Sequence, residues 1–265
     1  MLSAAHLHTI EQALTTRSGR VVVVELDRQR VIVKRQESRA RPFGYSALNL
    51  AAKILQQPIL CAVPAYGGAK GQATEVRRLR QLKDAAVAVP EVLHTGSDWI
   101  AISDAGETSI DYLLTRSTEP QLATWDKALA AILDTHRKGQ TLSQAFARNI
   151  HLHDGEIIFI DFEDDPLEVL SLAQAQTRDW LLFIHSTVYL MQLELQVLTE
   201  RFAHFVGQDS TEVQALIKNS GHSLAWLRHL PKQRKPWGRD VISLQGAGAL
   251  MHAFAQLRPR LTSGK

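Results

Sequence analysis

The sequence predicts an α+β fold in which a small antiparallel sheet precedes a larger helical region. Two runs of β-branched residues lie within the first forty residues, and two shorter runs follow around the turn-prone TGSD. From about residue 108 onward, apolar residues recur mostly with the 3.6-residue period of helices. We therefore expect two lobes, residues 1–103 and 104–265, separated by a cleft.

The N-terminal part begins with a predicted hairpin. Its strands cover 20–26 and 30–36 and are joined by DRQ. A helix is expected over 46–57, with the serine at its start as N-cap, and a second helix over 72–85 after the loop VPAYGGAKG. The two short strands around TGSD follow, and ISDAG at 102–106 then connects the two lobes.

The C-terminal part is predicted to be helical except for one hairpin. NIHLHDGEIIFIDF contains two short β runs around Asp154 and Gly155, a dipeptide typical of tight hairpin turns. Helices are expected over roughly 171–203, 209–218, 221–230 and 242–257.

The composition is that of a globular protein. The chain has 265 residues, of which 45% are hydrophobic and 22% are charged, enough for a substantial core. The net charge of +3 favours an anionic partner only weakly. The single cysteine, Cys61, excludes an intrachain disulfide and fits a reducing, cytoplasmic environment. We expect neither a secretory signal at the N-terminus nor a membrane span, because the most apolar stretch contains several polar residues.

A basic segment, HLPKQRKPWGR, covers residues 229–239. Contact with nucleic acid or with acidic lipid is one interpretation of its charge. A solvated loop between helices is the favoured interpretation, and we expect no nucleic-acid partner.

Lys34 and Glu75 are candidates for an ion pair. Lys34 ends the second predicted strand, where its ammonium can face a cleft while Val33 points to the other side of the sheet. Alone, it also fits a solvated lysine at a strand end. Glu75 is expected in the first turn of its helix, where a carboxylate also suits the helix dipole. Together they match the lysine–glutamate pair that orders a kinase site.

Asn149 and Asp161 are candidates for a metal site. They lie twelve residues apart at the two ends of the predicted hairpin, so oxygens from both can reach one cation. Kinases hold Mg²⁺ with an asparagine and an aspartate in this order. The acids that follow, Glu163, Asp164 and Asp165, are expected to form a solvated turn.

Taken together, these segments resemble a known family. VIVKRQ, ATEVRRLRQL, VPEVL, NIHLHDGEIIFIDFEDDP and AQTRDWLLFIHS resemble the bacterial lipopolysaccharide-kinase-like branch of the protein-kinase-like superfamily, and are similar to RIO kinases. The resemblance covers about residues 20–190.

The resemblance implies a two-lobed protein-kinase-like fold that uses ATP and Mg²⁺. It assigns phosphate binding to Lys34, with Glu75 holding that lysine, and adenine binding to the backbone around Ser103. It assigns Mg²⁺ to Asn149 and Asp161. Asp179 would be a buried acid that anchors the backbone near residues 143–145. The acceptor would be a hydroxyl of a sugar, lipid-linked or protein substrate, with a peripheral inner-membrane contact left open.

The chain departs from the kinase pattern in three ways. Gln144 stands five residues before Asn149, where kinases place their catalytic base, and an amide cannot accept a proton at neutral pH. No glycine-rich loop precedes the first hairpin, since Gly19 is the only glycine in the first forty residues. Glu163 replaces the glycine that usually follows Asp-Phe. A slow phosphotransferase and a pseudokinase that works by binding both remain open.

Overall fold

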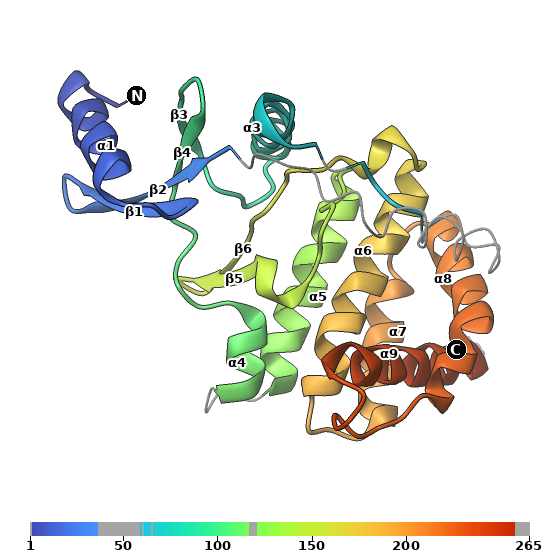
Figure 1. Ribbon diagram of the computed structural model, residues 1–265. Coiled ribbons are helices and arrows are strands. Elements are labelled where there is room, and N and C mark those ends of the chain that lie inside the picture. Colours follow the sequence, from blue (N-terminus) through green and yellow to red (C-terminus); the bar gives the residue numbers. More distant parts are fainter. Residues whose placement is uncertain (1, 37–58, 60, 65, 117–120, 258–265) are drawn as a thin grey trace.

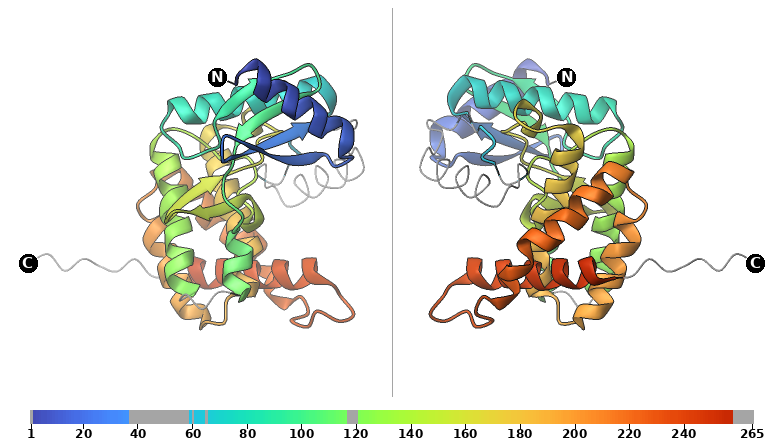
Figure 2. Two further views of the ribbon diagram at one scale, coloured as in Figure 1. Left: turned by 90° about the vertical axis from the view of Figure 1, so that its left-hand side faces the viewer. Right: turned by 90° about the vertical axis from the view of Figure 1, so that its right-hand side faces the viewer.

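The computed structural model describes residues 2–36, 59, 61–64, 66–116 and 121–257. The expected helix over 46–57 lies outside these residues. The described part is an α+β fold, as the sequence predicts. The sheet lies at one end of the molecule and the long C-terminal helix at the other (Figures 1 and 2).

Four strands form one antiparallel sheet. They are β1 (Val21–Leu26), β2 (Gln29–Arg35), β3 (Val92–Thr95) and β4 (Trp99–Ser103), in the order β1-β2-β4-β3. Asp27 and Arg28 both have positive φ, 48° and 65°, which gives the two-residue turn that matches the twist of a hairpin. The sheet therefore contains both predicted strand pairs.

The two faces of β2 serve different purposes. Val31 and Val33 pack with Ile10 of helix α1 (Ala4–Thr16) in a small core on one face. Lys34 alternates with them and so lies on the opposite face, toward the rest of the molecule. Helix α1 was not predicted from the sequence. Its N-cap is Ser3, whose hydroxyl accepts a hydrogen bond from the backbone amide of His6.

Helix α3 (Gly68–Asp84) lies beside the sheet, away from α1 (Figure 1). It begins four residues before the predicted start, because the glycines that suggested a loop are accommodated at its N-terminus, with Gly67 as N-cap. Val76, Leu79 and Leu82 form the apolar stripe that packs into the main core.

The predicted hairpin is present between the sheet and the large helices (Figure 1). Its strands are β5 (Ile150–His153) and β6 (Glu156–Phe159), paired antiparallel. Asp154 and Gly155 have φ of 49° and 84°, as the sequence pattern requires. A short 3-10 turn, η2 (Ala147–Asn149), leads into β5.

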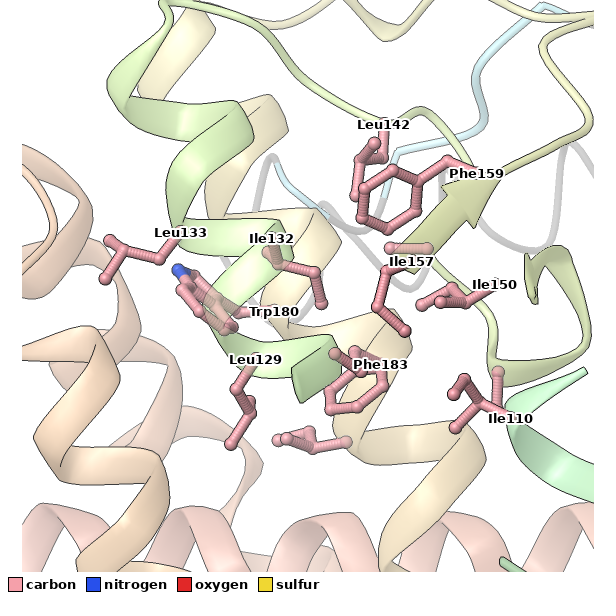
Figure 3. Close-up of a cluster of buried hydrophobic side chains, with 14 of the residues drawn as sticks. Ile110, Leu129, Ile132, Leu133, Leu142, Ile150, Ile157, Phe159, Trp180 and Phe183 are labelled. Carbon is pink, nitrogen blue, oxygen red and sulfur yellow. The ribbon is translucent and has the colours of Figure 1, made fainter. Parts of the chain in front are cut away.

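The remaining helices surround the main core. They are α4 (Ile110–Arg116), α5 (Gln121–Arg137), α6 (Leu172–Thr187), α7 (Leu195–Val206), α8 (Thr211–Leu224) and α9 (Arg239–Gln256), with 3-10 turns η3 (Pro166–Glu168), η4 (Val188–Leu190) and η5 (Ala225–His229). Residues from α5, α6 and both hairpin strands interlock there, among them Trp180, Phe183 and Phe159 (Figure 3).

Two helix boundaries differ from the prediction. The helix expected over 171–203 is two helices, because the chain turns after η4 although no proline or glycine marks the break. The helices expected over 209–218 and 221–230 are instead one helix, α8, followed by η5. Gly221 lies inside α8, where a Cβ would come within 3.0 Å of the Met251 carbonyl of α9. It therefore serves close helix packing rather than a turn.

Candidate functional site

The predicted ion pair between Lys34 and Glu75 is present. Lys34 Nζ lies 2.5 Å from Glu75 Oε1, and their side chains are only 12% and 5% exposed. Glu75 lies near the middle of α3 rather than in its first turn, so the expected interaction with the helix dipole is wrong. Contact with Lys34 accounts for the burial of this carboxylate, because a buried charge requires a partner.

Asn149 and Asp161 meet at the base of the hairpin. Asn149 ends η2 and Asp161 follows β6, and their side chains approach to 3.5 Å between Nδ2 and Oδ2. Asp161 Oδ1 also lies 4.0 Å from Lys34 Nζ. Segments far apart in the sequence therefore bring a lysine, two acids and an amide to one place.

The backbone at this site is strained at two positions. Asp161 and Ser143 have φ of 73° and 67°, a left-handed conformation that non-glycine residues seldom adopt. Each such residue costs about 1–3 kcal/mol and tends to occur where function requires a particular orientation. Ser143 precedes Gln144, the candidate catalytic residue, and Asp161 is the candidate metal ligand. The strain therefore falls on the two segments that sequence analysis selected.

Gln144 lies beside Asn149, as the comparison with kinase loops predicts. Its backbone carbonyl accepts a hydrogen bond from Asn149 Nδ2 at 3.1 Å. Its side-chain amide turns to Asp164 and donates to Oδ2 at 3.3 Å. The contact with Asn149 therefore involves the Gln144 backbone, while the Gln144 side chain is engaged with Asp164, a carboxylate that was expected in solvent.

The expectation of a solvated acidic turn at 163–165 is wrong. Asp164 is 9% exposed and Asp165 is 5% exposed. Asp165 pairs with Arg77 of α3 at 2.9 Å and its carboxylate also caps η3. Glu163 Oε1 lies 3.2 Å from Lys34 Nζ and also contacts Arg20. Each of the three acids therefore has a structural partner that lies far away in the sequence.

Asp164 is the most perturbed of these acids. Burial raises the pKa of its carboxyl group to about 6, and the negative charge of Asp161 adds to this rise. Its second oxygen, Oδ1, is buried without a hydrogen-bond partner. An unpaired carboxylate oxygen beside a second carboxylate is an environment that a cation would stabilise.

Three side chains at this site carry oxygen atoms of the kind that divalent cations bind. Asn149, Asp161 and Asp164 offer amide and carboxylate oxygens, the hard ligands that Mg²⁺ prefers. Among the residues that the structure describes, no group of three or more histidine, cysteine, aspartate or glutamate side chains could hold a metal ion. A metal site here would therefore need the amide oxygen of Asn149 as well as the Asp161 carboxylate.

Asp179 is fully buried, as predicted. Its Oδ2 accepts hydrogen bonds from the backbone of Leu142 and the hydroxyl of Thr141, each at 2.7 Å. These partners lie just before the expected 143–145. The carboxylate thus anchors the segment that leads to Gln144.

The same carboxylate belongs to a larger buried network. His136 Nε2 lies 3.4 Å from Asp179, and its Nδ1 lies 2.7 Å from Asp209. Burial lowers the pKa of His136, but its hydrogen bonds and charge contacts with the two carboxylates outweigh this effect and raise it above the ordinary value. Trp180 donates a further hydrogen bond to Asp209. The network connects α5, α6 and the segment before α8.

Sequence analysis did not identify Arg78, which joins α3 to the segment before Gln144. Its side chain is fully buried and donates to the Thr141 carbonyl at 2.6 Å. Burial lowers the pKa of this guanidinium group. No local sequence signal marks this role of Arg78, because its partner is a backbone carbonyl far away along the chain.

Ser103 ends β4, where the predicted connection between the two parts begins. Its amide donates to the Glu91 carbonyl, and its hydroxyl accepts from the Glu91 amide, both at 2.9 Å. The Ser103 amide and hydroxyl are therefore both occupied within this corner of the sheet.

The cavity beside Lys34 is small. Arg20, Lys34, Glu75 and Glu163 are among the residues around it, and its volume is about 20 Å³. A groove of about 940 Å³ lies between α7, α8 and the end of α9, but none of the candidate residues lines it. Lys34 and Glu75 therefore line a small cavity, whereas the larger groove contains none of the candidate residues.

Comparison of the sequence with models of known protein families and with curated proteins finds no match. In the part of the chain that the structure describes, every helix is too short or too polar to cross a membrane.

Proposed function

We propose that this chain is an ATP- and Mg²⁺-dependent phosphotransferase with a two-lobed, protein-kinase-like fold. The observation that carries the proposal is the meeting of Lys34, Glu75, Asn149 and Asp161, which come from β2, α3, η2 and the segment after β6. In kinases a strand lysine paired with a helical glutamate contacts the nucleotide phosphates, and asparagine and aspartate hold Mg²⁺.

The proposal divides the chain into an N-lobe, 1–103, and a C-lobe, 104–265. ATP would lie between them, with its adenine near the Ser103 carbonyl and its phosphates toward Lys34. Glu75 positions the ammonium group of Lys34, which otherwise has several directions open to it on a flexible side chain.

Asn149 and Asp161 would hold Mg²⁺, with the unpaired oxygen of Asp164 nearby. Bound Mg²⁺ supplies positive charge that neutralises the phosphoryl group in transfer. The chain itself contributes the fixed orientation of these oxygens, which the left-handed backbone at Asp161 and the buried Asn149 both favour.

The acceptor in this proposal is a hydroxyl of a sugar, a lipid-linked molecule or a protein. Gln144 would orient this hydroxyl by hydrogen bonding, since its amide cannot take the proton. A missing general base typically costs about 10²–10⁴-fold in rate, which leaves room for a slow enzyme. A cytoplasmic protein with a peripheral contact to the inner membrane is part of the same proposal.

A pseudokinase is the second candidate, and two observations favour it. Gln144 replaces the base, and the cavity beside Lys34 holds only about 20 Å³. Under this alternative the chain binds a nucleotide or a protein partner and transfers no phosphate.

Thermal-shift titration with ATP, with and without Mg²⁺, tests the proposal. We expect ATP to raise the melting temperature, more strongly with Mg²⁺, and Lys34→Met to remove the shift. Transfer of the labelled γ-phosphate from ATP to an acceptor hydroxyl or to water then separates the two candidates. A shift without turnover supports the pseudokinase, and the absence of any shift at millimolar ATP contradicts both nucleotide-binding versions.

A further inference from the structure

Two cations share one carboxylate beside the candidate site. Glu163 Oε1 lies 3.2 Å from Lys34 Nζ, and the same oxygen contacts the guanidinium of Arg20. The Glu163 side chain is 20% exposed and that of Arg20 is 41% exposed. Glu163 therefore bridges a nearly buried lysine and an arginine at the rim.

The position of Arg20 is fixed by the sheet. It immediately precedes β1, whose first residue, Val21, pairs with Lys34 of β2. The Arg35 amide donates to the Arg20 carbonyl at 2.9 Å, which extends the ladder by one residue. Arg20 thus lies opposite Arg35, one residue beyond the Val21–Lys34 pair, and its side chain is brought to the Lys34 site by its contact with Glu163.

Backbone amides of a glycine-rich loop do not serve this position. Such loops bind phosphate through consecutive amides, and Gly19 is the only glycine before Gly44. A phosphate chain that reaches Lys34 would therefore need further positive charge from side chains. Arg20 carries that charge, and its planar guanidinium suits bidentate contact with phosphate oxygens.

Among the residues that the structure describes, three carboxylates lie close to the Lys34 ammonium group. Glu75, Glu163 and Asp161 all lie within 4.0 Å of the ammonium, while Arg20 is the second cation in contact with Glu163. An incoming phosphate would be repelled unless one carboxylate moves away. Glu75 is held on a helix and is 5% exposed, whereas Glu163 lies on the segment between β6 and η3.

The size of the cavity leads to the same conclusion. Pockets for small ligands typically enclose about 300–1,000 Å³, far more than the roughly 20 Å³ beside Lys34. Glu163 lines this cavity together with Arg20 and Lys34. Movement of its side chain would open space and take one carboxylate away from both Lys34 and Arg20.

We propose that Arg20 is a second phosphate-binding cation and that Glu163 is an internal substitute for phosphate, which the nucleotide must displace from Arg20 and Lys34. This inference rests on the proposed function and adds to it a ligand residue and an autoinhibitory contact. Glu163 limits nucleotide affinity, while Arg20 contributes to it.

Isothermal titration with ATP, adenosine and inorganic tripolyphosphate tests the inference. In Glu163→Gln the amide keeps the shape of the side chain but loses the charge, and ATP and tripolyphosphate should bind at least about tenfold more tightly. Arg20→Ala should weaken both by a similar factor, and Arg20→Lys should restore part of the loss. Adenosine, which carries no phosphate, should bind all variants equally.

Matched controls change the same chemical groups elsewhere. Glu25→Gln and Arg80→Ala alter exposed residues on β1 and α3 and should leave all three affinities unchanged. Melting curves establish that each variant is folded. If Arg20→Ala fails to fold, Arg20→Gln and the Glu163→Gln variant still test the two halves of the inference.

The outcomes separate this inference from the proposed function. If ATP binds the parent chain but Arg20→Ala and Glu163→Gln leave its affinity unchanged, the inference is wrong and the proposed function stands. Weaker ATP binding in Glu163→Gln would mean that Glu163 orders the cations, and it would also overturn the inference. Tripolyphosphate binding that depends on Arg20, without ATP binding, would keep Arg20 as a phosphate-binding cation but would overturn both the displacement of Glu163 by a nucleotide and the proposed function. Binding of neither ligand to the parent or to Glu163→Gln contradicts both.

Discussion

The side-chain amide of Gln144 donates a hydrogen bond to the buried carboxylate of Asp164, with 3.3 Å between Nε2 and Oδ2. The candidate catalytic residue is therefore held by an acid twenty residues later in the chain. This pair determines what two substitutions at the site should do.

Asp164→Asn should stabilise the protein at neutral pH. Because the folded carboxyl group has a pKa of about 6 against an ordinary 3.8, the folded chain retains a proton that the unfolded chain releases between these values. The free energy of unfolding therefore falls as pH rises across this interval. Removing the charge should recover up to about 3 kcal/mol above pH 6 and almost nothing below pH 4.

Urea unfolding at about pH 4 and pH 7.5 measures this difference. Asp154→Asn is the control, since its carboxylate is almost fully exposed in the hairpin turn, where asparagine also adopts positive φ. An Asp164→Asn variant that is less stable than the parent at pH 7.5 would show that the ionised carboxylate has a stabilising partner, and would contradict the assignment of a charge destabilised by burial.

Gln144→Asp should raise phosphotransfer only when Asp164 is neutralised. A new carboxylate beside Asp164 adds like-charge repulsion, so the single variant should lose stability and gain little activity. Gln144→Asp with Asp164→Asn restores a proton acceptor without that repulsion. Its turnover should exceed the parent's, with about 10²–10⁴-fold as the ceiling. Release of labelled phosphate from ATP measures this, and equal turnover in the parent and the double variant would mean that the base was not lost at this position.

Asp161→Asn should weaken the Mg²⁺-dependent part of ATP binding by at least about tenfold. Asparagine is the appropriate substitution because the residue has a φ of 73°, which asparagine tolerates better than alanine. Titration calorimetry with saturating Mg²⁺ and with a chelator separates the two contributions. If ATP affinity with Mg²⁺ is unchanged in the folded variant, Asp161 is not a metal ligand.

His136 should make the free energy of unfolding depend on pH at higher pH values than Asp164 does. Its pKa is raised in the folded state, so the stabilisation is fully present below the unfolded value of about 6.5 and is lost as pH rises through the folded pKa. The urea midpoint should fall as pH rises above about 6.5. Replacing His136 with asparagine should remove this slope, and the same change at exposed His222 should not. A parent midpoint that rises over this range would contradict a protonated histidine between Asp179 and Asp209.

Local patterns predicted several parts of this site. Lys34 follows a β-branched run, Asn149 and Asp161 flank a hairpin whose turn residues are distinctive, and Asp179 precedes an apolar helical stretch. Each signal lies within a few residues of the position it predicts. Order and spacing then suggested the ion pair between Lys34 and Glu75, which is present.

The remaining features depend on contacts between distant segments. Asp164 and Glu163 read as a solvated turn because nothing near them in the sequence reveals Gln144, Arg20 or Lys34 as partners. Arg78 was not among the predicted site residues, because its partner is a backbone carbonyl sixty-three residues away. Such contacts depend on tertiary packing, which a periodic pattern in the sequence does not record.

A crystal structure with a non-hydrolysable ATP analogue and Mg²⁺ tests the central claim most directly. The account predicts phosphate oxygens within hydrogen-bonding distance of Lys34 Nζ and a cation held by Asn149 and Asp161, with the Lys34–Glu75 pair retained. Nucleotide bound away from Lys34, or an empty site at saturating analogue, would contradict it.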